Sequence, residues 1–245
     1  MLESVSWVAS RDRGTKIGYE PDALRAFNTA SIDLIADIRD EFSDVLIVLS
    51  AQMGPRGDGY VLDTQMSAAQ AESYHSEQME TLAATKADLV SAFTIGYAAE
   101  AIGIIRAGQR FDMPVAIAFT VETDGKLPSG MSLKDAIETV DMATNKAAAY
   151  FLINCAHPDH LTAALDEAPW ISRLRGIVVN ASRCSHAQLD NSTTLDEGNP
   201  VELGKQVAAI CARFPHFTII GGCCGTDMRH MDQIIGTTKA AKQVF

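Results

Sequence analysis

Residues Tyr150–Cys155 read YFLINC, an apolar run that ends in an asparagine and a cysteine. Two other runs are apolar along their whole length, VLIVLSA at Val45–Ala51 and PVAIAFT at Pro114–Thr120. Such runs are typical of buried parallel strands, because helices cover one face of the sheet and the core covers the other. These stretches therefore predict an α/β fold built on a parallel sheet.

Short β-rich runs alternate with longer segments of helical period along the chain. Strands are expected at Leu2–Ala9, Val45–Ala51, Asp88–Phe93, Val115–Thr120, Tyr150–Cys155, Gly176–Asn180 and Phe217–Gly221. Helices are expected at Pro21–Phe42, Ser67–Thr85, Ala98–Gln109, Ser132–Thr144, His160–Leu165, Pro200–Arg213 and Met228–Lys242. This alternation indicates a doubly wound sheet or a (β/α) barrel. No G-x-G-x-x-G follows the first strand, which counts against a dinucleotide-binding fold.

Three helices carry start signals in the sequence. Ser67 precedes an alanine-rich run and Ser132 follows a Pro-Ser-Gly turn, so both are predicted to cap a helix. Asn199 stands before Pro200, which places a capping side chain ahead of a proline at the first helical position. No proline- or serine-rich linker interrupts the pattern, so residues 1–245 are predicted to form a single domain with seven β-α units.

Composition limits the classes of partner. The chain has 20 Lys and Arg against 31 Asp and Glu, a formal net charge of -11, and an acidic surface repels nucleic acid. No apolar run reaches the roughly 18 to 20 residues that span a bilayer, so no membrane partner is expected. The first residues lack the order of a signal peptide. A cytoplasmic protein is the expectation.

The five cysteines are Cys155, Cys184, Cys211, Cys223 and Cys224. An odd number without a secretion signal argues against a disulfide framework. Residues Thr218–Thr226 read TIIGGCCGT, a strand followed by two cysteines between glycines and then by a helix. Adjacent strand residues point to opposite faces, so both thiols can face one ion only where the backbone leaves strand geometry, which glycine permits. The helix after them is expected to lower thiolate pKa values.

Cys155 ends another strand and supplies a third sulfur at the same edge, because active sites of β/α folds lie at the carboxyl ends of the strands. Three protein ligands with one open position are typical of catalytic zinc, and an all-sulfur set suits activation of a substrate thiol. The alternatives are core packing or a vicinal redox disulfide for the pair, and ligation by His157 or His160. Cys184 and Cys211 are interpreted as fillers or surface residues.

These residues resemble the homocysteine S-methyltransferase family. The family signature is Asn-Cys after the sixth barrel strand and Gly-Gly-Cys-Cys-Gly after the eighth, which here are Asn154-Cys155 and Gly221–Gly225. MGPRGDGY at Met53–Tyr60, AFTVETDGKLPSGMSL at Ala118–Leu133 and VVNAS at Val178–Ser182 are similar to further family segments. The resemblance covers essentially the whole chain.

The resemblance implies a (β/α)8 TIM-type barrel, and the first β-α unit, with its Asp-Gly-Gly element, is missing from the pattern. It implies Zn²⁺ bound by Cys155, Cys223 and Cys224, which would also be the catalytic residues. It implies methyl transfer from a small-molecule donor to homocysteine or a similar small thiol, forming methionine. It also implies homo-oligomers, since the missing unit leaves strand edges for a partner chain to cover.

The predicted substrate-binding residues are Asn180, Glu122, Thr94 and Ser4. Many relatives carry Phe-Glu-Thr after the fourth strand, whose Glu helps to hold the substrate amino group. The matching stretch here is Phe93-Thr94-Ile95, with Glu122 and Glu100 as stand-ins for the absent carboxylate. Two rival functions remain open: a zinc hydrolase on the same fold, which requires His or carboxylate ligands and a general base, and a non-catalytic relic that keeps zinc for structure.

Overall fold

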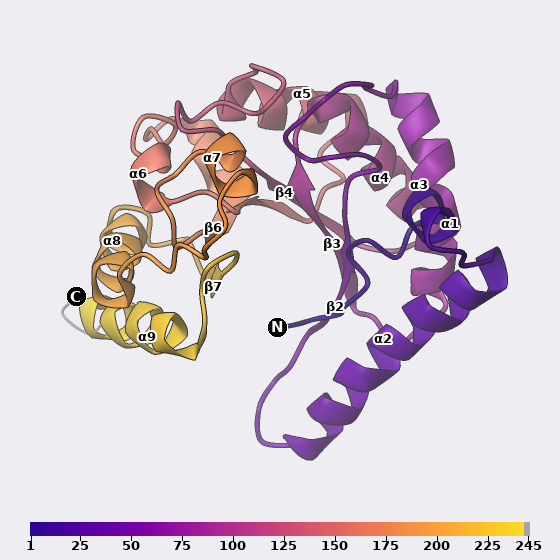
Figure 1. Cartoon of the computed structure of the whole chain (residues 1–245), viewed down its shortest axis with the longest axis horizontal. Helices are drawn as coiled ribbons and strands as arrows, with labels where there is room; N and C mark the ends of the chain where they lie inside the picture. The colour runs from indigo at the N-terminus through magenta and orange to yellow at the C-terminus, as the bar shows by residue number, and fades with distance from the viewer. Residues whose placement is uncertain (243–245) are drawn as a thin grey trace. The chain divides into compact units, whose positions relative to one another are not determined.

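The structure is a computed structural model that describes residues 1–242 of the chain (Figure 1). Its elements in chain order are β1 (Leu2–Glu3), α1 (Arg11–Lys16), α2 (Pro21–Glu41), β2 (Leu49–Met53), α3 (Ala68–Ala83), β3 (Leu89–Ile95), α4 (Ala98–Arg110), β4 (Val115–Phe119), α5 (Leu133–Thr144), β5 (Tyr150–Asn154), α6 (Pro158–Leu161), the 3-10 helix η1 (Pro169–Arg173), β6 (Leu174–Val179), α7 (His186–Asp190), α8 (Pro200–Arg213), β7 (Ile219–Gly222) and α9 (Met228–Lys242). No helix within residues 1–242 has the length and apolar character needed to cross a membrane.

The strands follow one another across the sheet in chain order, from β1 to β7. Parallel pairing is seen between β1 and β2, β2 and β3, β5 and β6, and β6 and β7. Sequential parallel strands joined by helices define an α/β fold with the strand order of a TIM-type barrel. The predicted fold class, with seven β-α units in place of eight, is confirmed.

The chain divides into two compact units. The first unit consists of Met1–Ala118 and Thr139–Ala149, and the second consists of Phe119–Glu138 and Tyr150–Phe245. In the first unit every residue of β3 is buried, as its continuous apolar run predicted. The single domain expected for residues 1–245 stays a prediction.

The strands of the second unit bring three carboxyl ends to one edge. Asn154 at the end of β5 lies opposite Val178 of β6, and Val179 lies opposite Gly222 at the end of β7. Because all three strands run in the same direction, the loops that follow them start side by side. This edge is where the two cysteine segments begin.

Helix starts follow the predicted capping chemistry. Ser67 forms a capping box with Gln70 at the start of α3, and Ser132 accepts a hydrogen bond from the backbone N–H of Asp135 at the start of α5. Asn199 accepts hydrogen bonds from two backbone N–H groups in the first turn of α8. Helix α8 then packs beside α9 in the second unit (Figure 1). All three predicted caps are confirmed.

Several predicted boundaries are wrong. The first strand ends at Glu3 and does not reach Ala9, because the hydroxyls of Ser4 and Ser6 bond to each other and Ser6 also bonds to the carbonyl of Gln52. Strand β2 starts at Leu49, and the predicted start at Val45 lies in an exposed segment. Helix α6 begins at Pro158 and ends at Leu161, earlier than His160–Leu165, because His157 caps it. Helices α1 and α7 and the 3-10 helix η1 were not predicted.

Candidate metal centre

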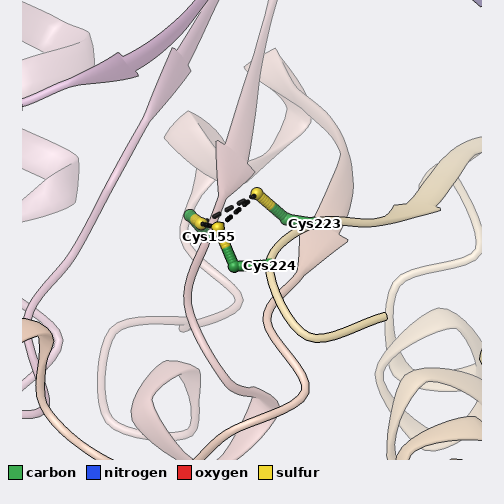
Figure 2. A group of neighbouring side chains, drawn as sticks. All are labelled: Cys155, Cys223 and Cys224. Carbon is green, nitrogen blue, oxygen red and sulfur yellow. Dashed lines mark hydrogen bonds between the residues drawn. The ribbon is translucent and has the colours of Figure 1, made fainter. Parts of the chain in front are cut away.

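Three cysteine side chains meet after two strands of the second unit (Figure 2). Cys155 directly follows β5, and Cys223 and Cys224 directly follow β7. The Sγ atom of Cys155 lies 2.8 Å from that of Cys223 and 3.3 Å from that of Cys224, and the tandem pair is 3.9 Å apart. Residues 68 positions apart in the chain therefore form one compact group of sulfur atoms.

The backbone leaves strand geometry at both segments, as the flanking glycines indicated. Cys155 has a left-handed φ of 56°, an uncommon conformation for a residue with a side chain. Gly225 has a φ of 74° just after the pair, where a Cβ atom would lie 2.8 Å from the carbonyl oxygen of Asp196. Uncommon backbone angles of this kind cluster at functional sites and persist only where the surrounding structure holds them.

Backbone hydrogen bonds hold both segments against β6 and the loop after it. The N–H of Cys155 donates to the carbonyl of Val178 at 2.9 Å, and the N–H of Cys223 donates to that of Val179 at 2.7 Å. The N–H of Ala181 donates to the carbonyl of Cys224 at 3.0 Å. The strand between the two cysteine segments thus sets the position of all three sulfurs.

The three thiols share their protons unequally. The hydrogen bonds from Cys155 and Cys223 lower the pKa of Cys224 to about 3, although burial opposes the shift. Hydrogen bonds with Cys155 and Cys224, together with burial, raise the pKa of Cys223 far above its usual value. The hydrogen bond with Cys223 lowers the pKa of Cys155, but the bond with Cys224 and burial outweigh it and raise that pKa to about 11. The group thus carries its negative charge on Cys224.

The donor set fits a soft divalent metal ion. All three cysteines are free thiols, and their sulfur atoms lie within 4.8 Å of one another. Sulfurs around tetrahedral zinc lie about 3.8 Å apart, given zinc–sulfur bonds of about 2.3 Å. The tandem pair has this spacing, and the distance between the sulfurs of Cys155 and Cys223 would have to increase by about 1 Å to match it. Three sulfurs leave a fourth position for a substrate atom.

Within residues 1–242, the potential metal ligands that gather in this way are the three cysteines. His157 is buried and its Nδ1 accepts the backbone N–H of Asp159, while Nε2 of His160 lies 3.0 Å from the carbonyl of Arg183. Cys211 is buried in α8, and Cys184 is exposed near Asp196. The structure assigns none of these four to the sulfur group.

Of the four predicted substrate-binding residues, Asn180 lies beside the sulfur group. Its Nδ2 donates to Sγ of Cys155 at 3.9 Å, and its Oδ1 accepts the N–H of Ser182 at 2.9 Å. Glu122 follows β4 in the same unit and sits half-buried in a turn closed by Lys126. Thr94 and Ser4 are buried in the other unit, where Thr94 has a φ of 62° at the end of β3. The substrate roles of all four stay predictions.

A hydrogen bond that joins two loops of the site was not predicted from the sequence. Ser182 donates its hydroxyl proton to Oδ2 of Asp196 at 2.6 Å, which fastens the loop after β6 close to Gly225. The carboxyl group of Asp196 also accepts the N–H of Gly198 at 3.1 Å. The hydrogen bond with Ser182 and that with Gly198 lower the pKa of Asp196, so it stays charged. The loop sequence carries no motif that points to this contact.

Glu100, which the sequence offered as a stand-in for the absent family carboxylate, belongs to the first unit, and its role in substrate binding stays a prediction. Its Oε1 atom accepts hydrogen bonds from the backbone N–H of Arg56 at 2.8 Å and from Nε2 of His75 at 2.9 Å. The side chain is thus held in place by its own unit.

The chain is thus a parallel α/β protein in which three cysteines that could hold a metal ion gather at the carboxyl ends of the strands. The family model for homocysteine S-methyltransferase matches residues 1–237, and the chain belongs to that family. The search of curated proteins found no match.

Solved structures of the homocysteine methyltransferase MmuM from Escherichia coli share the fold. The metallated form has a TM-score of 0.68 at 17% identity and the oxidized form 0.72 at 18%; each match covers 97% of this chain and 78% of the other. The apo form has a TM-score of 0.65 at 18% identity, covering 91% of this chain and 76% of the other. This similarity shows that the chain shares the fold of those structures.

Proposed function

We propose that this chain is a zinc-dependent enzyme that transfers a methyl group from a small-molecule donor to the thiol of homocysteine, or of a similar small thiol, and so forms methionine. The observation that carries the proposal is the convergence of the Cys155, Cys223 and Cys224 sulfurs in a chain that belongs to the homocysteine S-methyltransferase family. We place the activity in the cytoplasm, where reducing conditions keep thiols free.

Zinc held by Cys155, Cys223 and Cys224 would supply Lewis acidity that lowers the pKa of the substrate thiol, which is about 8.5 when free. The substrate sulfur, without its proton, attacks the methyl carbon of the donor. The sulfur–carbon bond forms as the bond between that methyl carbon and the donor breaks, and the bonding electron pair leaves with the donor. The protein's own task is to align the two reactants and exclude water.

In this proposal, different residues hold the metal, orient the reactants and contact the substrate. The three cysteines hold the metal, and the Asn180 amide beside Cys155 orients that ligand or the substrate. Glu122, Thr94 and Ser4 contact the amino acid part of the substrate. A zinc hydrolase would need histidine or carboxylate ligands, and the gathered ligands within residues 1–242 are all cysteines, which favours the methyltransferase.

The test combines metal analysis with turnover. Purified protein is assayed for zinc content and for methylation of homocysteine with S-methylmethionine, betaine and S-adenosylmethionine in parallel. We expect one zinc ion per chain and methionine formation with one of the three donors. Zinc binding without transfer from any donor would support the non-catalytic relic, and absence of zinc binding would refute the proposal entirely.

A further inference from the structure

A small cavity lies inside the first unit, between the start of α1, helix α2 and helix α3. Its volume is about 20 Å³, and Ser10, Tyr74 and His75 are among the residues that line it. A cavity of roughly 10–15 Å³ is already large enough for one water molecule, provided that two to four polar atoms bind it. We call this space the Tyr74 cavity, and its size restricts it to a ligand as small as water.

The residues that line the Tyr74 cavity bring unsatisfied polar atoms to it. Ser10, Tyr74 and His75 are all more than nine-tenths buried, with exposed fractions of 8%, 6% and 1%. Within residues 1–242, the Oγ atom of Ser10, the Oη atom of Tyr74 and the Nδ1 atom of His75 have no hydrogen-bond partner. Buried polar atoms in folded proteins are nearly always bonded to protein or to an ordered water molecule. Three such atoms around one cavity therefore point to a bound ligand.

The Ser10 hydroxyl is available because it does not cap its own helix. Ser10 is the N-cap residue of α1, where a serine side chain usually accepts a backbone N–H of the first turn, yet its side chain makes no such bond. Burial raises the pKa of Tyr74, and the nearby Ser10 hydroxyl partly opposes that rise. The two hydroxyl groups are thus neighbours, although no hydrogen bond closes between them.

His75 has one ring nitrogen engaged and one left over. Its Nε2 lies 2.9 Å from Oε1 of Glu100, and because a carboxylate accepts, Nε2 carries a proton. In a neutral imidazole the other nitrogen is then an acceptor, so Nδ1 needs a donor. The rings of Tyr74 and His75 meet edge to face with their centroids 5.0 Å apart, so the two side chains reach the cavity from neighbouring positions of α3.

The charges around the cavity favour a neutral ligand. Arg11 and Arg25 also line it, and two guanidinium groups repel an alkali or ammonium ion of similar size. Water both donates and accepts hydrogen bonds, and each hydroxyl can turn to suit it. A single water molecule can therefore satisfy all three buried atoms.

We propose that the Tyr74 cavity binds one water molecule, which donates a hydrogen bond to Nδ1 of His75 and bonds to the hydroxyl groups of Ser10 and Tyr74. The water keeps the proton of His75 on Nε2, so the ring continues to donate to Glu100. His75 is thereby a positioning residue for the Glu100 side chain. The proposal does not depend on zinc or on methyl transfer, because every residue that carries it lies in the first unit.

A crystal structure of the full chain tests the ligand directly. We expect density for one water molecule within about 2.6–3.2 Å of Ser10 Oγ, Tyr74 Oη and His75 Nδ1. A direct bond between the Ser10 and Tyr74 hydroxyls, with no density between them and His75, would overturn the proposal. Crystals soaked in a rubidium salt separate water from a cation, since an anomalous signal in the cavity would identify a cation instead.

Nitrogen-15 NMR of the histidine rings tests the bridge in solution. We expect His75 Nδ1 to carry no proton and to show the shift of a nitrogen that accepts a hydrogen bond. Ser10→Ala and Tyr74→Phe should each move this resonance toward that of an unbonded ring nitrogen. Ser43→Ala and Tyr19→Phe, which remove exposed hydroxyls of the same unit, should leave it in place. A proton on Nδ1, or an unmoved resonance in both cavity variants, would contradict the proposal.

A double-mutant cycle shows whether Ser10 and Tyr74 share one ligand. Ser10→Ala and Tyr74→Phe should each lower the folding equilibrium constant about tenfold, because the water loses a partner. Two atoms that bind the same water are coupled, so the double variant should lose clearly less than the roughly hundredfold product. A full hundredfold loss would mean that the two hydroxyls act separately. If Tyr74→Phe does not fold, the crystal structure of the unchanged protein decides.

Discussion

Asn180 donates a hydrogen bond from Nδ2 to the sulfur of Cys155 at 3.9 Å, while its Oδ1 accepts the N–H of Ser182 at 2.9 Å. The second bond determines which end of the amide faces the sulfur, because only the NH₂ end remains for Cys155. The Asn180 amide therefore helps to position Cys155, a proposed metal ligand.

We expect Asn180→Leu to weaken zinc binding by about tenfold to a hundredfold, the range found when outer partners of metal ligands are removed. Competition with a chromophoric chelator measures the affinity. Asn191→Leu is the matched control, since Asn191 is exposed and its Nδ2 donates to the carbonyl of Ala187. Unchanged zinc affinity in Asn180→Leu would show that the amide does not support the metal.

Cys224→Ala should abolish both zinc binding and methyl transfer, because two sulfurs cannot complete a three-cysteine site. Metal content and methionine formation are measured on the same preparation, and Cys223→Ala should behave in the same way. Cys184→Ser, which changes an exposed thiol outside the group, should keep both properties. Turnover like that of the unchanged protein in Cys224→Ala would remove the mechanism.

Gly225→Ala should disturb the sulfur centre by more than the backbone strain of placing alanine at a left-handed φ. Its added Cβ atom would lie 2.8 Å from the carbonyl oxygen of Asp196, in addition to the strain of a φ of 74°. Gly130→Ala is the control, because Gly130 has a φ of 81° but no atom within 4 Å of the new Cβ.

We expect Gly130→Ala to cost about 1–2 kcal/mol of unfolding free energy and no zinc affinity. Gly225→Ala should cost more and should also lower zinc affinity. Urea denaturation and chelator competition give the two quantities. Equal behaviour of the two variants would mean that the contact with Asp196 does not constrain the cysteine loop.

His157 makes the metal-free protein sensitive to acid. Burial lowers its pKa from 6.5 to about 4, with Asp159 partly opposing the shift. The unfolded chain therefore takes up a proton below about pH 6.5 that the folded chain refuses until about pH 4, so stability is lost as the pH falls through this window. A shift of this size corresponds to about 3 kcal/mol at the acid end.

His157→Asn keeps a side chain able to cap α6 but removes the titration. With a chelator present, urea denaturation from pH 7.5 to pH 4 should show a shallower loss of stability in this variant, by up to about 3 kcal/mol. The same slope in both proteins would assign the acid sensitivity to other groups.

The fold and the grouping of the three cysteines could be predicted from the sequence because both depend on local pattern. Buried parallel strands read as continuous apolar runs, and YFLINC and the glycine-flanked pair mark the ends of two of them. The first strand was predicted too long because serine side chains compete for backbone groups, which periodicity does not register. The support from Asn180 and the Ser182–Asp196 bond depend on contacts between separate loops, which a single sequence does not reveal.

The cysteine loop is tied to β6 by backbone hydrogen bonds that involve no metal: Cys223 to Val179, and Ala181 to Cys224. In zinc fingers the ion supplies the folding energy and its removal unfolds the chain. Here backbone hydrogen bonds to the sheet and to the loop after β6 hold the cysteine segments in place, so removal of a bound ion should leave the apoprotein folded. If the proposed zinc site is correct, we expect zinc to be replaceable by another metal, such as cobalt for spectroscopy, without refolding.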